Sequence, residues 1–511
     1  MYTGKHAYLR SLQPAFIMAS TGESVTYREL EARSNRLAHL FRKRGLRRLD
    51  HYAIFMENNN RYLEACGAGE RAGLYYTCVN SYLTAGELAY ILTNSQSRIL
   101  ITSKLKLDVA REALKECPKI ELCIVADGDG ESGRTVGLSE ATAGLPKTPI
   151  ADESLGTSML YSSGTTGRPK GIKAPLPTDP IETPNVLVQL ASKFYGLRPD
   201  SIYLSPAPLY HAAPLRWCMT VNFVGGTVVL MDRFDPERAL ALIERYKVTH
   251  AQWVPTHFVR MLRLPPEVRQ RYDVSSMKVA LHAAAPCAIP VKEQMLDWWG
   301  PVVYEYYAGT EGNGMTAITA AEWLERKGSV GRAINGEIRI CDETGEPVSP
   351  GTEGTIYFAG GREFEYHNAP QKTRETRNRY GWSTLGDVGY VDRDGYLFLT
   401  DRKAFMIISG GVNIYPQEIE NVLIADPRVM DVAVFGAPDD EMGEKVVAVV
   451  QPVDFAAAGP ALADELLALA REQLSHVKVP RLIEFTRELP RHPNGKLYKR
   501  LLRDEYWNRK L

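Results

Sequence analysis

The sequence predicts an α/β fold class: a large N-terminal multi-lobed α/β domain with a β-rich subdomain, plus a small α+β C-terminal domain. Three observations predict this class. From Ser24 to about Gly331, short apolar strands alternate with helical stretches, which is typical of a parallel sheet covered by helices. After Gly331, short strands follow one another with Gly, Pro and Asp turns between them. From Asp401 onward, strands and helices alternate again in a compact tail.

The N-terminal region is expected to open with a short strand and a helix within Ser24–Leu46. Thr26 can cap this helix, because Glu29 follows three residues later as in a capping box. The pattern then predicts strands and helices in turn, at Ile99–Thr102 (strand), Leu107–Cys117 (helix), Leu122–Val125 (strand), Thr227–Met231 (strand), Pro236–Tyr246 (helix), His250–Val254 (strand), Val279–His282 (strand) and Val291–Trp299 (helix).

The β-rich region is expected to hold strands at Glu337–Cys341, Gly354–Ala359, Val388–Val391 and Tyr396–Thr400. Asp394-Gly395 predicts a tight hairpin between the last two strands. A domain boundary is placed at Asp401–Ala404. Beyond it the pattern predicts a helix, two strands and a second helix at Pro416–Leu423, Val429–Phe435, Val446–Val450 and Ala461–Leu474.

Composition limits the class of protein. The chain has 511 residues, of which 44% are hydrophobic and 24% charged, an ordinary globular balance. Lys plus Arg and Asp plus Glu both number 61, so bulk charge gives no reason to expect a nucleic-acid partner. The seven cysteines form no Cys-x-x-Cys pair, and no apolar run is long enough for a transmembrane segment. The first ten residues also lack the apolar core of a signal peptide. Together with the unpaired cysteines, this predicts a cytoplasmic protein.

The segment Tyr161–Gly171 carries the strongest chemical signal. It joins four Ser and Thr hydroxyls, three glycines, one arginine and one lysine. Glycines allow backbone N–H groups to approach a ligand, hydroxyls donate hydrogen bonds, and the cations neutralise charge, so the mixture favours a polyphosphate-binding loop. The spacing excludes a Walker A loop, because Lys170 is followed by Gly171. The alternative interpretation is a surface turn rich in Gly and Ser.

Four further segments carry candidate chemistry. Tyr306–Gly312 joins aromatic rings that can stack on a base with a threonine and a glutamate, and a carboxylate suits a hard cation such as Mg²⁺. Gly381–Asp387 ends in an acid suited to ribose hydroxyls, and Arg402 adds a cation one hairpin later. His492–Lys496 is a turn that displays one lysine. Each segment alone also has a structural reading: core packing for the tyrosines, a local cap for Asp387 and a solvated turn for the lysine.

In this order, the segments resemble those of AMP-forming acyl-CoA synthetases of the adenylate-forming superfamily, which also includes luciferases and peptide-synthetase adenylation domains. Ile407–Pro416 and Pro490–Lys496 match as well, and the resemblance covers about Ser24 to Arg503. It implies an AMP-binding and acyl-binding domain at residues 1–400, a hinge at 401–404 and a mobile C-terminal domain at 405–511 that carries the catalytic lysine.

The resemblance also implies roles by position. Catalytic roles fall to Lys496, Thr310, Glu311 and His211. ATP and AMP would be bound by Ser162, Ser163, Gly164, Thr165, Thr166, Gly167, Lys170, Ala284, Ala285, Pro286, Tyr306, Tyr307, Ala308, Gly309, Thr310, Asp387, Tyr396, Arg402 and Lys496. Mg²⁺ would lie at Glu311 and Thr166, and coenzyme A would be handled in the thiol step by Gly410, Gly411 and Asn413.

Two positions depart from the family pattern. Ala308 stands where the family has a glycine, which matters little if its φ stays negative. Ala404 stands where the family places an Asp or Lys at the hinge. Rotation is still possible, since backbone torsions make the turn.

The carboxylic acid is indicated less sharply. His211 would orient it, with packing as the alternative. Trp217, Trp253, Val254 and Met315 would line the acyl pocket, although such side chains are commonly core. The set is apolar and roomy, which favours a fatty or bulky alicyclic or aromatic acid.

We therefore expect a ligase that uses ATP to convert a carboxylic acid to acyl-AMP and pyrophosphate, and then forms acyl-CoA. The alternatives are an enzyme that loads a carrier protein, a luciferase-like oxygenase, and a non-enzymatic homologue that binds acyl ligands. The last predicts loss of Lys170, Glu311 or Lys496, and all three are present. The sequence leaves open the acid and its chain length, the pathway, the thiol acceptor and whether the chain forms a homodimer.

Overall fold

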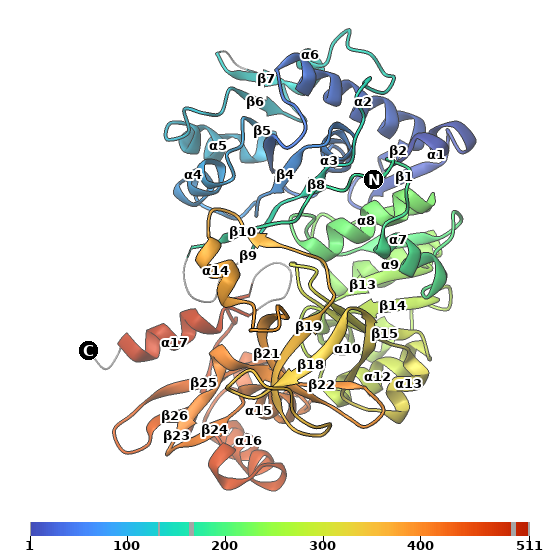
Figure 1. The fold of residues 1–511 in the computed structure, drawn as a ribbon. Coiled ribbons are helices and arrows are strands. Elements are labelled where there is room, and N and C mark those ends of the chain that lie inside the picture. Colours follow the sequence, from blue (N-terminus) through green and yellow to red (C-terminus); the bar gives the residue numbers. More distant parts are fainter. Residues whose placement is uncertain (1, 131–132, 163–167, 492–496, 509–511) are drawn as a thin grey trace. The chain divides into compact units, whose positions relative to one another are not determined.

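The computed structural model describes residues 2–130, 133–162, 168–491 and 497–508 (Figure 1). The chain divides into two compact units. Unit 1 comprises Met1–Phe234, Leu242–Gln252 and Glu363–Thr373, and unit 2 comprises Asp235–Ala241, Trp253–Arg362 and Arg374–Leu511.

Unit 1 contains a six-stranded parallel sheet in the order β7-β6-β5-β3-β4-β8. Strands β5 and β6 are buried along their whole length, as expected for a parallel sheet covered on both faces. The predicted strands at Ile99–Thr102 and Leu122–Val125 are confirmed, while the predicted helix after Leu107 ends at Leu114. The elements are β3 (His51–Phe55), α3 (Tyr62–Ala72), β4 (Tyr75–Cys78), α4 (Ala85–Asn94), β5 (Ile99–Thr102), α5 (Leu107–Leu114), β6 (Leu122–Val125), β7 (Thr135–Gly137), α6 (Leu138–Ala141) and β8 (Thr157–Ser158).

A second group of strands in unit 1 runs parallel in the order β13-β11-β12-β1, with β2 antiparallel at the edge. Helix α2 begins with the predicted capping box: Glu29 N donates to Thr26 Oγ1 at 3.2 Å, and Thr26 N donates to the Glu29 carboxylate at 2.9 Å. The elements are α1 (Gly4–Leu9), β1 (Pro14–Met18), β2 (Ser24–Thr26), α2 (Tyr27–Lys43), α7 (Val186–Lys193), β11 (Ile202–Ser205), α8 (Ala212–Val224), β12 (Thr227–Leu230), α9 (Pro236–Tyr246) and β13 (His250–Trp253).

Unit 2 holds strands in the order β18-β19-β21-β22-β17-β16-β15-β14, parallel only between β14 and β15. This confirms the β-rich region. The elements are α10 (Pro255–Leu262), α11 (Pro266–Arg269), β14 (Val279–His282), α12 (Ile289–Trp299), β15 (Val303–Ala308), β16 (Met315–Ile318), α13 (Ala320–Glu325), β17 (Ser329–Asn335), β18 (Glu337–Cys341), β19 (Gly354–Ala359), β21 (Ser383–Val391) and β22 (Leu397–Arg402). Helix α14 (Pro370–Glu375) begins in unit 1 and ends in unit 2.

The turn between β21 and β22 corrects one prediction. The two strands form the predicted hairpin, but the turn begins at Asp392 and is not a two-residue turn at Asp394-Gly395: Gly395 N donates to Asp392 O at 3.1 Å, and Asp392 N donates to Tyr396 O at 2.9 Å. Asp392 Oδ1 accepts the backbone N–H groups of Asp394 and Tyr396, both at 2.9 Å. Gly395 alone in this loop has a positive φ, 82°. Backbone hydrogen bonds and the Asp392 side chain therefore close this turn together, where the sequence favoured a two-residue primed turn.

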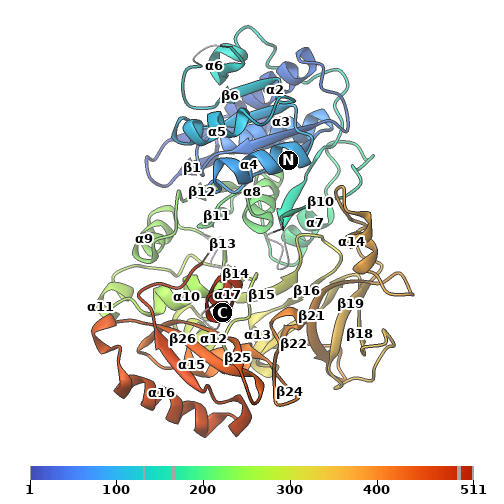
Figure 2. The same ribbon diagram turned by 90° about the vertical axis from the view of Figure 1, so that its left-hand side faces the viewer.

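The C-terminal part of unit 2 packs two layers of helix around one sheet (Figures 1 and 2). Val432 and Val434 of β25 join the core beneath α15 and α16, whereas Ala433 and Phe435 face Tyr506 and its neighbours in α17. This alternation follows from the two-residue period of a strand. The elements are β23 (Ile407–Ser409), β24 (Val412–Ile414), α15 (Pro416–Leu423), β25 (Val429–Asp439), β26 (Gly443–Pro452), α16 (Pro460–Gln473), β27 (Leu482–Phe485) and α17 (Lys499–Asn508).

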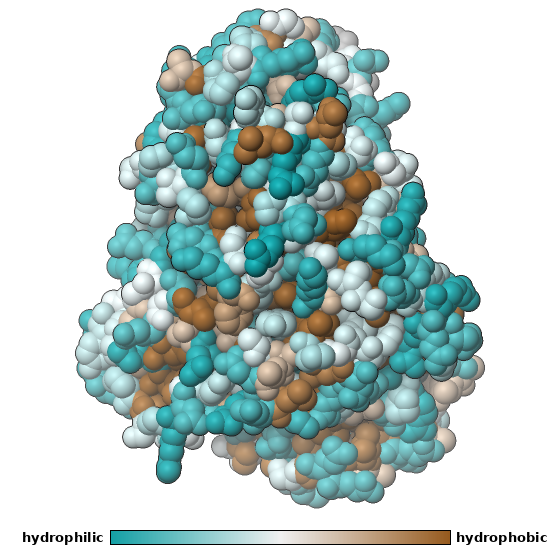
Figure 3. All heavy atoms as spheres, turned by 90° about the vertical axis from the view of Figure 1, so that its right-hand side faces the viewer, coloured by the Kyte–Doolittle hydropathy of each residue, from teal (hydrophilic) through white to brown (hydrophobic). Residues whose placement is uncertain are grey.

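Hydrophilic and hydrophobic side chains are mixed over the face drawn in Figure 3. Within the described ranges, no helix combines the length and the apolar character needed to cross a membrane. All seven cysteines are free thiols.

Candidate functional site

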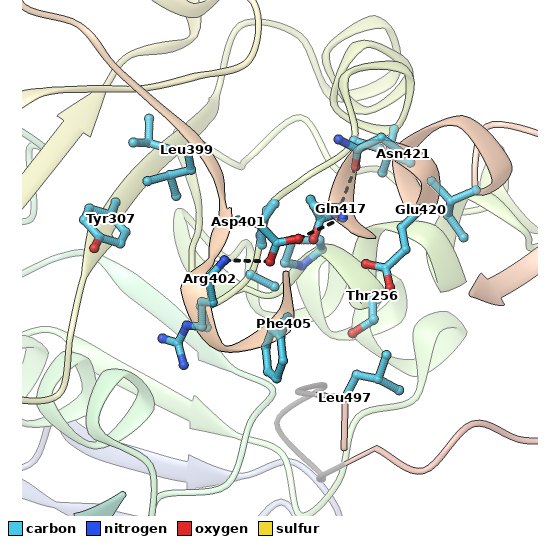
Figure 4. Close-up of a pocket in the computed structure, with 18 of the residues that line it drawn as sticks. Thr256, Tyr307, Leu399, Asp401, Arg402, Phe405, Gln417, Glu420, Asn421 and Leu497 are labelled. Carbon is cyan, nitrogen blue, oxygen red and sulfur yellow. Dashed lines mark hydrogen bonds between the residues drawn. The ribbon is translucent and has the colours of Figure 1, made fainter. Parts of the chain in front are cut away.

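A pocket of about 260 Å³ lies within unit 2, where the predicted nucleotide residues meet the C-terminal part of the chain (Figure 4). From β15, β21, β22 and the turns after β14 and β15 it is lined by Ala284, Ala285, Pro286, Tyr306, Tyr307, Ala308, Gly309, Asp387 and Arg402. From the C-terminal part it is lined by Gln417, Glu420, Asn421, Arg491, Leu497 and Lys499. Nine residues that the sequence assigned to AMP thus meet at one cavity.

Tyr307, Asp387 and Arg402 are bound to one another in this pocket. Tyr307 Oη donates to Asp387 Oδ2 at 2.6 Å, and Arg402 Nε donates to Asp387 Oδ1 at 2.8 Å. Burial raises the pKa of the Tyr307 hydroxyl well above its usual value, and the Asp387 carboxylate adds to that rise. The same carboxylate raises the pKa of Arg402. The Tyr307 hydroxyl therefore stays protonated and donating, and Arg402 stays charged.

The turn 283–286 follows β14 and carries a feature that the sequence did not predict. Ala284, Ala285 and Pro286 are exposed at the pocket. Ala284 has a φ of 76°, in the left-handed region that costs a residue with a Cβ about 1–2 kcal/mol. Ala308, by contrast, ends β15 and is not among the described residues with positive φ. An alanine can therefore stand there in place of the family's glycine without backbone strain.

The turn after β15 places the predicted metal-binding carboxylate beside a glycine. Thr310 and Glu311 are half-buried there, and Gly312 N donates to Gly309 O at 3.1 Å. A Cβ on Gly309 would lie 2.1 Å from Leu385 Cδ1 and 3.1 Å from Glu311 Oε2. The absent side chain therefore leaves room first for Leu385 and then for the Glu311 carboxylate beside it. A carboxylate at this place suits Mg²⁺ held partly by substrate phosphates.

A buried charged cluster that the sequence analysis missed reaches the pocket through Glu305, one of its lining residues. Lys292 Nζ donates to Glu305 Oε2 at 2.7 Å and lies 4.6 Å from the centre of the Trp323 ring. Burial raises the pKa of Glu305, and Lys292 opposes that rise. His282 Nε2 lies 3.3 Å from the same carboxylate. The cluster supports β15, the strand that carries Tyr306 and Tyr307. In the sequence, the one sign of this cluster was Lys292 on the inner face of α12.

The proposed hinge follows β22 directly. Asp401 Oδ1 accepts Arg402 N at 2.6 Å, and Asp401 Oδ2 accepts Gln417 N at 3.0 Å, so that Asp401 caps the start of α15 (Figure 4). Lys403–Phe405 form a short 3-10 helix in which Ala404 is exposed. The hinge at 401–404 stays a prediction, because the division into two units follows other boundaries.

Two ion pairs of the C-terminal part flank the segment that contains Lys496, which itself lies outside the described residues. Arg491 Nη2 donates to Asp431 Oδ1 at 2.6 Å, and Nε donates to Oδ2 of the same carboxylate. Lys499 Nζ lies 2.7 Å from Glu420 Oε1, with both side chains nearly buried. Arg491 and Leu497 form an antiparallel bridge. Arg491 and Leu497, which both line the pocket, are therefore held beside each other.

The predicted phosphate loop lies in unit 1. Its residues Ser163, Gly164, Thr165, Thr166 and Gly167 lie outside the described residues. The flanking strands β9 (Leu160–Ser162) and β10 (Lys170–Lys173) pair antiparallel, with Ser162 opposite Lys170. Strand β20 (Glu365–Tyr366) pairs with the other edge of β10, and Lys170 Nζ lies 5.1 Å from the centre of the Tyr366 ring.

The remaining predicted residues do not line the pocket. Tyr396 donates its hydroxyl to Glu322 at 3.2 Å and lies between Arg326 and Arg332. Trp253 is fully buried against Phe258 and Trp299. In unit 2, Val254 precedes α10 and Met315 begins β16. In unit 1, Trp217 is buried and His211 is half-buried. Gly410, Gly411 and Asn413 are exposed around the β23–β24 turn.

Comparison with known proteins decides the family. A family model described as "AMP-binding enzyme" matches residues 5–364, and one described as "AMP-binding enzyme C-terminal domain" matches 418–496. The chain belongs to the AMP-binding enzyme family. This confirms the predicted membership of the adenylate-forming superfamily of acyl-CoA synthetases and the expected fold class.

Curated relatives and solved structures cover nearly the whole of this AMP-binding enzyme. A feruloyl-CoA synthase from Amycolatopsis sp is 35% identical over 94% of this chain and 93% of that protein. The fatty acid–[acyl-carrier-protein] ligase ScoC from Streptomyces coeruleorubidus is 31% identical over 99% of this chain and 96% of that protein. The crystal structure of ATP-bound MatB from Rhodopseudomonas palustris superposes with a TM-score of 0.82 at 29% identity and covers 100% of both chains.

Proposed function

We propose that this AMP-binding enzyme is an AMP-forming acyl-CoA synthetase. In the first half-reaction an oxygen of the substrate carboxylate attacks the α-phosphorus of ATP, forms the acyl–phosphate bond of acyl-AMP and expels pyrophosphate. In the second, the thiol sulfur of coenzyme A attacks the acyl carbon, loses its proton and expels AMP. The observation that supports this most is the pocket in unit 2, which gathers nine of the predicted AMP residues.

Roles within the pocket follow from its chemistry. The ring of Tyr307 would stack on adenine beside the turn at Ala284. The carboxylate of Asp387 has lone pairs beyond the two that Tyr307 and Arg402 occupy, and these would accept the ribose hydroxyls. Thr310 would donate to the α-phosphate. Glu311 would hold Mg²⁺, which would neutralise phosphate charge.

Lys496 would bring the carboxylate and the α-phosphate together. Two anions repel each other, and phosphoryl transfer is catalysed mainly by positioning and by cations. One lysine about 4 Å from such a charge supplies roughly 4 kcal/mol at an effective dielectric constant of 20, before its own desolvation. The predicted phosphate loop, between Ser162 and Lys170, would hold the pyrophosphate leaving group.

The acid is proposed to be bulky and hydrophobic, aromatic or fatty. Support comes from the apolar residues assigned to the acyl site and from the 35% identity to a feruloyl-CoA synthase. Loading of a carrier protein is the second candidate, because a relative at 31% identity is named for that activity. A cytoplasmic location is proposed from the free thiols. Homodimerisation stays a prediction.

A pyrophosphate-release assay tests this proposal. The purified enzyme would receive ATP, Mg²⁺ and ferulate, dodecanoate or acetate, each with and without coenzyme A. Saturable thioester formation with ferulate or dodecanoate, well above that with acetate, is the expected result. Turnover of acetate alone would contradict the proposed acid class. Adenylation without any use of coenzyme A would favour the carrier-loading candidate.

A further inference from the structure

Arg263, the residue after helix α10, binds the end of a helix in the C-terminal part of unit 2. Its Nη2 donates to three backbone carbonyls, those of Val429 at 2.9 Å, Asp426 at 3.0 Å and Ile424 at 3.3 Å, and its Nε donates to Val429 O at 3.3 Å. Helix α15 ends at Leu423, with Ile424 as its C-cap. Arg263 therefore occupies the carbonyl end of this helix.

The chemistry of this contact makes it specific for one arrangement. The last carbonyls of a helix have no partner within the helix, and the negative end of its dipole attracts a cation. A guanidinium carries five donors in a fixed plane and can bind several carbonyls at once, which an ammonium group cannot do with the same geometry. The Asp426 carboxylate binds Arg428 at 2.8 Å, so Arg263 contacts Asp426 through its backbone oxygen.

In the arrangement that Arg263 stabilises, the residues that flank Lys496 lie at the nucleotide pocket. Arg491 and Leu497, which flank the segment of Lys496, line the same cavity as Tyr307 and Asp387. Gly411 and Asn413, assigned to the thiol step, are exposed and are not among the residues that line it. Arg491 and Leu497 at the pocket are what the proposed role of Lys496 in acyl-AMP formation requires.

We infer that Arg263 is a positioning residue that holds the C-terminal domain in its adenylate-forming orientation. The inference rests on the proposed function. With the hinge proposed at 401–404, rotation would move α15, with Ile424, Asp426 and Val429, away from α10, and all four hydrogen bonds of Arg263 would have to break before the thiol step. Arg263 thus favours the first half-reaction and opposes the movement that leads to the second.

Separate assays of the two half-reactions test this inference. Arg263→Ala and Arg263→Lys would be compared with the unmodified enzyme in ATP–pyrophosphate exchange and in single-turnover thioester formation from isolated acyl-AMP and coenzyme A. The acid would be ferulate or dodecanoate, whichever turns over faster. Arg260→Ala is the matched control, because Arg260 is an exposed arginine of the same helix.

We expect Arg263→Ala to lower the rate of exchange by about tenfold, since charged hydrogen bonds and the orientation they favour are lost together. Thioester formation from supplied acyl-AMP should be unchanged or faster. Arg263→Lys should lie between, and Arg260→Ala should match the unmodified enzyme. Equal loss of both half-reactions, or no loss of exchange, would overturn the inference. Failure of the proposed function would look different, because the unmodified enzyme would then show no acid-dependent exchange.

Discussion

Tyr307 donates its hydroxyl to the Asp387 carboxylate at 2.6 Å, and the two residues come from different strands, β15 and β21. The hydrogen bond holds the Tyr307 ring, which is proposed to stack on adenine, beside the Asp387 carboxylate, which is proposed to bind ribose. Arg402 completes the arrangement at 2.8 Å on the other carboxylate oxygen. One carboxylate thus orders an aromatic ring and a cation before ATP arrives.

The first prediction separates these roles. Asp387→Ala should raise the KM for ATP by roughly ten- to a hundredfold, because it removes an acceptor and leaves Tyr307 and Arg402 without their shared partner. Tyr307→Phe keeps the ring and should raise the KM less than about threefold. Steady-state kinetics at saturating acid measure both. A larger effect for Tyr307→Phe than for Asp387→Ala would contradict the assigned roles.

The second prediction concerns the strained turn at the pocket. Ala284→Gly should stabilise the protein by up to about 1 kcal/mol, because glycine adopts a positive φ without steric cost, although its greater freedom when unfolded offsets part of the gain. Ala285 has no positive φ. Ala285→Gly should therefore destabilise the protein by a similar amount. Denaturant unfolding decides the sign of each change, and equal destabilisation by both would refute strain at Ala284.

The third prediction is a loss of stability in mild acid. His51 is buried, stacks on Tyr75 at 4.8 Å and lies 5.5 Å from His367. Burial, and then the charge of Lys173, lowers the pKa of His51 to about 3. Below its unfolded pKa of about 6.5 the unfolded chain binds a proton that the folded chain does not, so stability falls by up to about 1.4 kcal/mol per pH unit.

Unfolding at pH 7.5, 6 and 5 measures this loss. His51→Phe keeps a ring for the stack but cannot take a proton, so it should reduce the dependence on pH. His476→Gln, at an exposed histidine, is the control and should not change the slope. A slope unaffected by His51→Phe would show that other groups cause the acid sensitivity.

The fourth prediction concerns the thiol step. Gly411→Leu should block thioester formation and spare adenylation, because Gly411 lies at the β23–β24 turn and outside the nucleotide pocket. Gly411 has a φ of 80°, so leucine would also strain the turn. Gly411→Asn controls for this strain, since asparagine tolerates a left-handed backbone. If both half-reactions fall equally in Gly411→Leu, a role confined to the thiol step is wrong.

The sequence predicted the elements whose signals are local. The capping box at Thr26 and the strands at Ile99–Thr102 and Glu337–Cys341 were found because caps and apolar runs depend on a few neighbouring residues. The hairpin after Val391 was predicted, but its turn begins at Asp392, whose side chain also binds the backbone N–H groups of Asp394 and Tyr396. Ala284 was assigned to the nucleotide, but its positive φ depends on the path of the chain around the pocket.

Local sequence patterns did not predict the tertiary contacts. The hydrogen bonds from Arg263 to Val429 span 166 positions and have no local signal, whereas the pair Lys292–Glu305 spans 13 and was indicated only by a lysine on the inner face of α12. Tyr396 was assigned to AMP by position, whereas the structure directs its hydroxyl to Glu322. The family motifs predicted which residues gather, and tertiary packing decides which of them reach the pocket.

The most direct test of the central claim is ATP–pyrophosphate exchange by Lys496→Ala, with Lys445→Ala as a control in the same domain. The account predicts a folded protein that retains ATP binding but loses acid-dependent exchange by at least about a hundredfold, since each 1.36 kcal/mol of lost transition-state stabilisation is tenfold in rate. Lys445→Ala should exchange normally. Near-normal exchange by Lys496→Ala would contradict the mechanism.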